Sequence, residues 1–189
     1  MRLSNKDAKE YYEICFKLFH AVNEKHQLNP SFATFAHGEV PSEEASIIRD
    51  YIWDHPESID EVIANNENVG YNDRELAVLE TWRNRYIYSD FVIVEHRSNH
   101  TVFMDTKNDM RLYAVQGIYE SLKKVFPPRI IPVLLIKTVL LPFKNKIIID
   151  GSLNMAHPED IEELTDEFLK SYREAKKKWG TTFTLPHRE

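Results

Sequence analysis

Apolar residues recur at a helical spacing along the first half of the chain. Between residues 5 and 27 they fall three or four positions apart, which is the period of an amphipathic helix. The same spacing returns over residues 42–54, over 57–64 and from 76 to about 88. The stretch 28–41 carries two prolines and one glycine and predicts a loop between the first two helices. The pattern therefore predicts four helices in this half.

Two of these helices are preceded by the signature of a capping box. Asp54 stands three residues before Glu57, and Asn72 stands three residues before Glu75. In such a pair the first side chain accepts a hydrogen bond from the backbone N–H of the glutamate, and the glutamate accepts one in return. Both positions are therefore predicted helix N-termini.

The spacing changes in the second half, where Val, Ile and Phe become frequent and short polar turns separate the apolar runs. Residues 90–97, 100–105 and 110–116 predict three successive strands, joined by turns too short for anything but antiparallel pairing. A long apolar strand over 133–141 and its return over 146–150 complete a predicted five-stranded antiparallel meander. Such a sheet forms either a curled sheet or a small open barrel.

The last part of the chain predicts a helix that begins near Pro158. Acidic residues crowd its first turns and lysines its last turn, which complements the helix dipole, and Gly180 is a natural stop. The residues expected to face the core are Leu164, Phe168, Tyr172 and Trp179.

These elements predict an α+β fold in which the N-terminal helices pack on the meander and the C-terminal helix covers it. We expect a helical segment over 1–89 and the antiparallel sheet with its helix over 90–189, folding together as one cooperative unit. The length of 189 residues fits one domain, or one domain with a helical extension.

The predicted strand pair at residues 139–153 has the sequence VLLPFKNKIIIDGSL. Its strands are apolar on both faces, which indicates burial on both sides. The turn of this pair contains Asn145, a residue type that tolerates a positive φ.

This segment resembles a group of bacterial proteins that share a strand pair of the form LLPFKxKIIxDG, and the resemblance extends over about residues 55–175. It implies a bacterial origin and no established activity, so no site residue is carried over. Some members of that group have a Cys-rich zinc tail, and this sequence departs from them because Cys15 is its single cysteine.

Charge and cysteine content exclude several functions. The formal net charge is -6, and the only basic surplus is a small one over residues 90–157. That surplus is far from the basic footprint of a nucleic-acid-binding domain, so nucleic acid is not an expected partner. A single cysteine excludes an internal disulfide and a Cys-based zinc site.

The N-terminal residues predict no export. Residues 1–13 are polar and mixed in charge, without the apolar core of a signal peptide. The longest apolar stretch, 130–143, is too short and too interrupted by Pro and Lys to cross a bilayer. We therefore expect a cytoplasmic protein that does not associate with membranes.

No cofactor is predicted, because none of the five glycines lies in a GxGxxG, GxxxxGK[ST] or GxSxG motif. The candidate chemistry lies mainly around residues 90–105. His96 and His100 stand four apart, next to Glu95, and could bind a metal only if the predicted turn brings the rings together. The simpler interpretation is solvated turn histidines, so no metal is predicted.

Two other acids have both a structural and a catalytic interpretation. Asp105 and Lys107 have the acid-x-lysine spacing of metal-dependent nucleases, although the same residues fit a plain turn. Asp150, at the end of a predicted strand, is either a general base or an acid that stabilises a turn. The candidate catalytic residues are Glu95, His96, Asp105, Lys107 and Asp150.

The leading hypothesis is a non-enzymatic binding or interaction module whose partner is a protein or a small molecule. The alternative is a metal-dependent hydrolase or nuclease that uses the carboxylates and histidines around residues 90–105. A deep pocket with converging polar side chains would favour the enzyme, and a flat apolar surface would favour the module.

Overall fold

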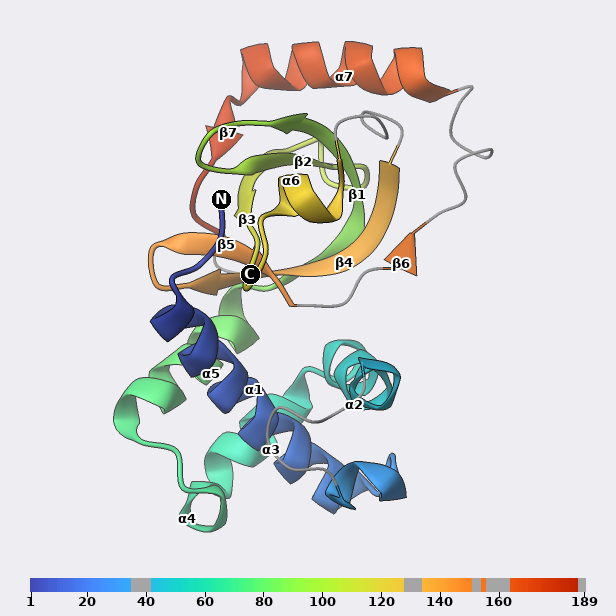
Figure 1. Ribbon diagram of the computed structural model, residues 1–189. Helices are drawn as coiled ribbons and strands as arrows, with labels where there is room; N and C mark the ends of the chain where they lie inside the picture. Colours follow the sequence, from blue (N-terminus) through green and yellow to red (C-terminus); the bar gives the residue numbers. More distant parts are fainter. Residues whose placement is uncertain (35–41, 128–133, 151–153, 156–163, 187–189) are drawn as a thin grey trace. The chain divides into compact units, whose positions relative to one another are not determined.

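The computed structural model has an α+β fold (Figure 1). Contacts divide the chain into two units, which we call the helical unit (Lys6–Arg85) and the sheet unit (Met1–Asn5 with Tyr86–Glu189). The residues that the structure describes are 1–34, 42–127, 134–150, 154–155 and 164–186.

The helical unit is built around one long helix whose apolar stripe is buried, as its spacing predicts. Tyr11, Ile14 and Leu18 on that stripe are each 1% exposed, and the ring of Tyr11 meets the edge of Trp82 at 5.6 Å between centroids. None of the described helices is long and apolar enough to cross a membrane. The helices that form the unit are α1 (Asn5–His26), η1 (Pro30–Thr34), α2 (Ser42–Asp54), α3 (Glu57–Ala64), α4 (Asn66–Val69) and α5 (Asp73–Arg85).

One of the two predicted capping boxes is confirmed. At the start of α5, Asn72 Oδ1 accepts a hydrogen bond from the Glu75 N–H at 3.0 Å, and Glu75 Oε2 accepts one from the Asn72 N–H at 2.9 Å. The box predicted at Asp54 is wrong, because α2 continues through Asp54 and α3 begins after Pro56 without a side-chain cap. A residue that is still helical cannot adopt the extended backbone of an N-cap.

The described residues of the sheet unit form one mixed sheet and two helices. Its path is β1-β2-β3-β5-β4-β6, and β7 pairs with β3 outside that path. The elements are β1 (Ile87–His96), β2 (Thr101–Asp105), β3 (Leu112–Gln116), α6 (Leu122–Val125), β4 (Leu134–Phe143), β5 (Lys146–Ile149), β6 (Asn154–Met155), α7 (Thr165–Lys178) and β7 (Thr181–Thr182).

All five predicted strands are present, but their connection differs from a meander. β5 pairs with β3 in parallel, through Val115 opposite Ile147. β4 pairs antiparallel with β5 and also with β1, so the pairings run from β1 through β2, β3, β5 and β4 back to β1. The predicted five-stranded antiparallel meander is therefore wrong, because the sheet is mixed and β5 lies between β3 and β4. Because β5 pairs with both β3 and β4, the β4–β5 hairpin inserts β5 between these two strands.

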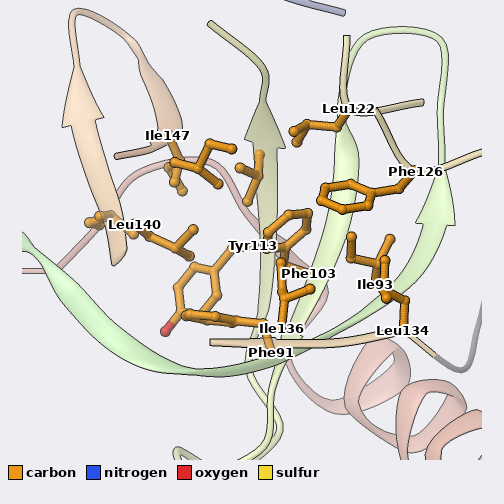
Figure 2. Close-up of a cluster of buried hydrophobic side chains, with 13 residues drawn as sticks. Phe91, Ile93, Phe103, Tyr113, Leu122, Phe126, Leu134, Ile136, Leu140 and Ile147 are labelled. Atoms are coloured by element: carbon orange, nitrogen blue, oxygen red, sulfur yellow. The ribbon is translucent and has the colours of Figure 1, made fainter. Parts of the chain in front are cut away.

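Alternate residues of the first strands face two different clusters. Phe91 and Ile93 of β1 and Phe103 of β2 point into an inner cluster, which the close-up in Figure 2 shows. Val92 of β1 and Met104 of β2 belong to a second cluster that also contains Ala175 of α7. Both faces of these strands are buried here, which explains the unbroken apolar runs at 91–94 in β1 and 102–104 in β2.

The C-terminal helix covers the second cluster through a narrow stripe. Ala175 is 4% exposed, and the half-buried Phe168 and Tyr172 pack beside it. Leu164 and Trp179 were predicted to face the core and are instead 43% and 36% exposed. Both lie at the ends of the helix, where the helical period no longer directs a side chain toward the sheet; the Trp179 ring stacks against the Arg111 guanidinium, 3.7 Å away.

The β4–β5 hairpin is buried on both faces, as its sequence predicts. Val139 and Leu140 are consecutive on β4 and therefore point to opposite faces, and they are 1% and 0% exposed. In the turn, Lys144 rather than Asn145 has a positive φ, of 53°. A positive φ at the first turn residue alone is compatible with a tight two-residue hairpin.

Candidate functional site

Asp105 is a fully buried acid whose two carboxylate oxygens hold the turn that follows β2. Oδ1 accepts hydrogen bonds from Ser89 Oγ at 2.7 Å and from the backbone N–H groups of Lys107 and Asn108 at 2.9 and 3.2 Å. Oδ2 accepts a hydrogen bond from Asn108 Nδ2 at 2.7 Å. These contacts fit the structural interpretation of this acid, because they use both of its oxygens.

Lys107 does not extend the Asp105 site through its side chain. Its ammonium group lies 2.7 Å from Asp90 Oδ2, and only its backbone N–H meets Asp105. The acid-x-lysine spacing therefore serves a turn and a surface ion pair in this structure.

The two histidines around the β1–β2 turn have separate surroundings. His96 donates from Nε2 to the Phe126 carbonyl oxygen at 2.7 Å, and its Nδ1 lies 2.8 Å from the Thr101 hydroxyl. His100 is 4% exposed, and its Nδ1 lies 2.6 Å from Asn99 Oδ1. Within the described ranges, no three His, Cys, Asp or Glu side chains come together as a metal site.

The Glu95 side chain links β1 to α7 through polar contacts. Its carboxylate accepts hydrogen bonds from the Arg97 guanidinium at 2.9 and 3.0 Å and from the Tyr172 hydroxyl, and Lys176 lies 3.6 Å away. Burial acts to raise the pKa of Glu95, but the hydrogen bonds from Tyr172 and Arg97 outweigh it and lower that pKa. This acid therefore joins the C-terminal helix to the sheet.

Asp150 lies directly after β5 and is 8% exposed. Its backbone N–H donates to the Val139 carbonyl oxygen at 3.1 Å, and its Oδ1 accepts a hydrogen bond from the Thr138 hydroxyl at 3.4 Å. Both partners belong to β4, so Asp150 extends the hairpin pairing by one residue.

The buried histidines predict that the protein loses stability on mild acidification. Burial lowers the pKa of His96, His100 and His20 below the ordinary value of about 6.5. In the unfolded chain each regains its ordinary pKa, so below about pH 6.5 the unfolded state binds more protons than the folded state. The penalty is absent above about pH 7 and grows as the pH falls through 6.5 toward the lower folded pKa values.

Urea unfolding at about pH 8 and about pH 5.5 measures this effect, and the midpoint should be lower at the acidic pH. His96→Gln keeps a donor and an acceptor but does not titrate, so the variant should show a smaller difference between the two pH values. An equal or higher midpoint at the acidic pH would contradict the prediction.

A groove in the helical unit was not predicted from the sequence. It has a volume of about 650 Å³ and lies between α1 and the segment that joins α3 to α4. Its lining residues are Phe16, Lys17, His20, Ala21, Glu24, Lys25, Asn65, Asn68 and Val69.

Two glutamates hold the lysines of this groove in place. Lys17 Nζ lies 2.9 Å from Glu75 Oε2 and donates to the Gly70 carbonyl oxygen at 3.3 Å. Lys25 Nζ lies 2.9 Å from Glu61 Oε2. Glu75 also closes the capping box of α5, so the sequence that starts α5 also positions Lys17.

Aromatic rings form one wall of the groove. The His20 ring meets Phe16 at 4.4 Å and Phe32 at 4.8 Å between centroids. Burial lowers the pKa of His20, and nearby Glu24 opposes that shift. His20 therefore presents a largely uncharged ring at neutral pH.

One sequence signal for this groove exists. Phe16, His20 and Glu24 recur every four residues along α1, on a different face from the buried stripe. The facing residues Asn65 and Asn68 lie far along the chain, Asn65 at the end of α3 and Asn68 in α4, and nothing in the spacing connects them to α1.

Comparisons with known proteins give no further guidance, because no family model, no curated protein and no solved structure matches the chain.

Proposed function

We propose that the protein is a non-enzymatic binding module whose helical unit takes a small organic acid in the groove between α1 and the α3–α4 segment. The observation that carries the proposal is that one groove is lined by both hydrogen-bond donors and apolar side chains, which come from two segments distant in sequence. Small-molecule sites combine an apolar lining with a few polar groups and have volumes of about 300–1,000 Å³, a range that includes this groove.

The lining favours a ligand that carries a carboxylate on an apolar body. Lys25 has three N–H donors, one of which is directed at Glu61; Asn68 donates one amide N–H to Asn65 Oδ1, and each of the two asparagine amides has further N–H donors. A carboxylate accepts several hydrogen bonds at once, and charge-assisted bonds of this kind are the stronger ones. Phe16, Ala21 and Val69 then contact the apolar part.

In the sheet unit, the outer face of strands β2 and β3 offers little room for a ligand. Small five-stranded sheets can bind oligonucleotides or oligosaccharides on the face of their second and third strands. In this protein Val102 and Met104 of β2 and Leu112 of β3 are buried in one cluster with Ala175 of α7. This cover, and the net charge of -6, support a small-molecule ligand over a nucleic acid.

The contacts around residues 90–105 also favour the module over the alternative hydrolase or nuclease. Both carboxylate oxygens of Asp105 accept hydrogen bonds from neighbouring groups. Both ring nitrogens of His96 are also hydrogen-bonded. Glu95 joins α7 to β1. A catalytic role would require these side chains to give up contacts that hold the sheet unit together.

A groove-filling variant tests the proposal. Ala21 lines the groove on α1, so Ala21→Trp should block it without removing a hydrogen-bonding group. Ala77 is exposed on α5 and lies outside the groove lining, so Ala77→Trp is the matched control. Ligand-observed NMR with a library of small aromatic and aliphatic carboxylic acids, and with their primary amides, measures binding to each variant.

We expect carboxylic acids to bind the unmodified protein and Ala77→Trp, and to lose at least about tenfold in affinity for Ala21→Trp, which corresponds to about 1.4 kcal/mol. The amides should bind more weakly than the acids. Equal binding to the two tryptophan variants, or no binding by any acid, would refute the groove as the ligand site.

A further inference from the structure

A second cluster in the helical unit joins a carboxylate, an imidazole and a phenol in series. His26, at the end of α1, places Nε2 2.9 Å from Glu61 Oε2 of α3. The other ring nitrogen, Nδ1, lies 3.0 Å from the hydroxyl of Tyr51 on α2. Three helices thus bring together a possible nucleophile, a base and a group that orients the base.

The chemistry of each group fixes the direction of these hydrogen bonds. A carboxylate only accepts, so His26 donates from Nε2 to Glu61. In the neutral imidazole Nδ1 then carries no proton and accepts the hydrogen bond of the Tyr51 O–H. Hydrogen bonds from Lys25 and from His26 lower the pKa of Glu61, which keeps the carboxylate ionised at neutral pH.

The phenol is held from its other side as well. The His55 ring stacks on the Tyr51 ring, with 4.4 Å between centroids and 21° between planes, while Tyr51 itself is only half-buried. A restrained ring with a general base on its hydroxyl is the arrangement that activates a hydroxyl nucleophile. Tyr51 and His26 do not line the groove described above, although Glu61 pairs with both His26 and the groove's Lys25.

We propose that Tyr51 is an activated nucleophile that accepts acyl groups from activated acyl donors, with His26 as its general base and Glu61 as the residue that positions His26. Tyr51 Oη attacks the acyl carbonyl carbon while its proton passes to His26 Nδ1. The bond from that carbon to the leaving group then breaks, and His26 returns the proton to the leaving group. The products are the Tyr51 ester and the protonated leaving group, with no change in oxidation state.

Acetylation by N-acetylimidazole tests this site directly, because the leaving group is imidazole and the product is O-acetyltyrosine. Mass spectrometry of proteolytic fragments measures the initial rate at each tyrosine of the full chain. Tyr119, which is 49% exposed, serves as the internal reference for an accessible phenol. General-base catalysis contributes about 10²–10⁴-fold in enzymes, so Tyr51 should react at least about tenfold faster than Tyr119 despite its partial burial.

His26→Asn retains a hydrogen-bond acceptor but removes the base, and it should bring the Tyr51 rate down to that of Tyr119. Glu61→Gln retains size and should give an intermediate rate. A solvent deuterium isotope effect is expected at Tyr51 in the unmodified protein and should disappear in His26→Asn, a change that a merely structural role would not produce. The rate at Tyr119 should be the same in all variants.

Two results would overturn the proposal. The first is a Tyr51 rate in the unmodified protein no higher than that of Tyr119, which needs no variant to fold. The second is an unchanged Tyr51 rate in both His26→Asn and Glu61→Gln.

Discussion

Replacing Asp105 with alanine should lower the free energy of unfolding by about 3 kcal/mol or more. The side chain is fully buried and accepts four hydrogen bonds, from Ser89, Lys107 and Asn108. Hydrogen bonds to a charged group contribute about 1.5–3 kcal/mol each, and a buried donor that loses its acceptor adds a desolvation cost. Ser89 is itself 2% exposed, so water cannot readily replace the carboxylate there.

Urea unfolding followed by circular dichroism measures this loss, and two further variants sharpen it. Asp105→Asn keeps one acceptor oxygen, so it should be destabilised less than Asp105→Ala. Glu120→Ala removes an exposed acid that pairs with Lys124 at the surface, and such pairs contribute at most about 1 kcal/mol. If Asp105→Ala unfolded at the same urea concentration as the unmodified protein, the structural role of Asp105 would be untenable and its candidacy as a functional acid would return.

The helices show how much local pattern can predict. The buried stripe of α1 and the Asn72–Glu75 capping box follow from contacts between residues a few positions apart. The end of α7 is also local, since Gly180 has a φ of 67°, as expected of a helix stop. Such features can be predicted because the groups that form them are close in sequence.

The order of the strands depends on distant residues and was not predicted correctly. The parallel pairing of Val115 with Ile147 is decided by where the chain re-enters the sheet after α6. When both faces of a strand are buried, as those of β1 and β2 are, its apolar sequence does not indicate which other strand pairs with it. The sequence therefore indicated five strands but not their arrangement.

The candidate site was missed for the same reason. The groove needs Lys25 on α1 and Asn65 after α3, and the series of Tyr51, His26 and Glu61 needs three helices. The sequence directed attention to residues 90–105 because acids and histidines are close together there. In the folded chain those side chains instead hold turns and join α7 to β1.

Replacing Phe103 with alanine should also destabilise the protein strongly, by about 3–5 kcal/mol. Phe103 is fully buried in the inner cluster, where its ring centroid lies 6.0 Å from that of Phe91 (Figure 2). Strands β1 to β5 pair in a closed circuit around this cluster, which limits how far the walls can collapse into the space that the ring leaves. The cost of a cavity is largest where such collapse is prevented.

The matched control is Phe183→Ala, because Phe183 is 54% exposed in the same unit and its removal should change stability by no more than about 0.5 kcal/mol.

The Phe103→Ala variant also tests whether the chain unfolds as one cooperative unit. Two of the three tryptophans, Trp53 and Trp82, are buried in the helical unit and report on it, whereas Phe103 and the more exposed Trp179 lie in the sheet unit. Cooperative unfolding requires the fluorescence midpoint of Phe103→Ala to shift as far as the overall transition. A fluorescence midpoint that stays in place while the sheet unit melts earlier would show that the two units unfold independently, and an unshifted transition by every probe would contradict the burial of Phe103.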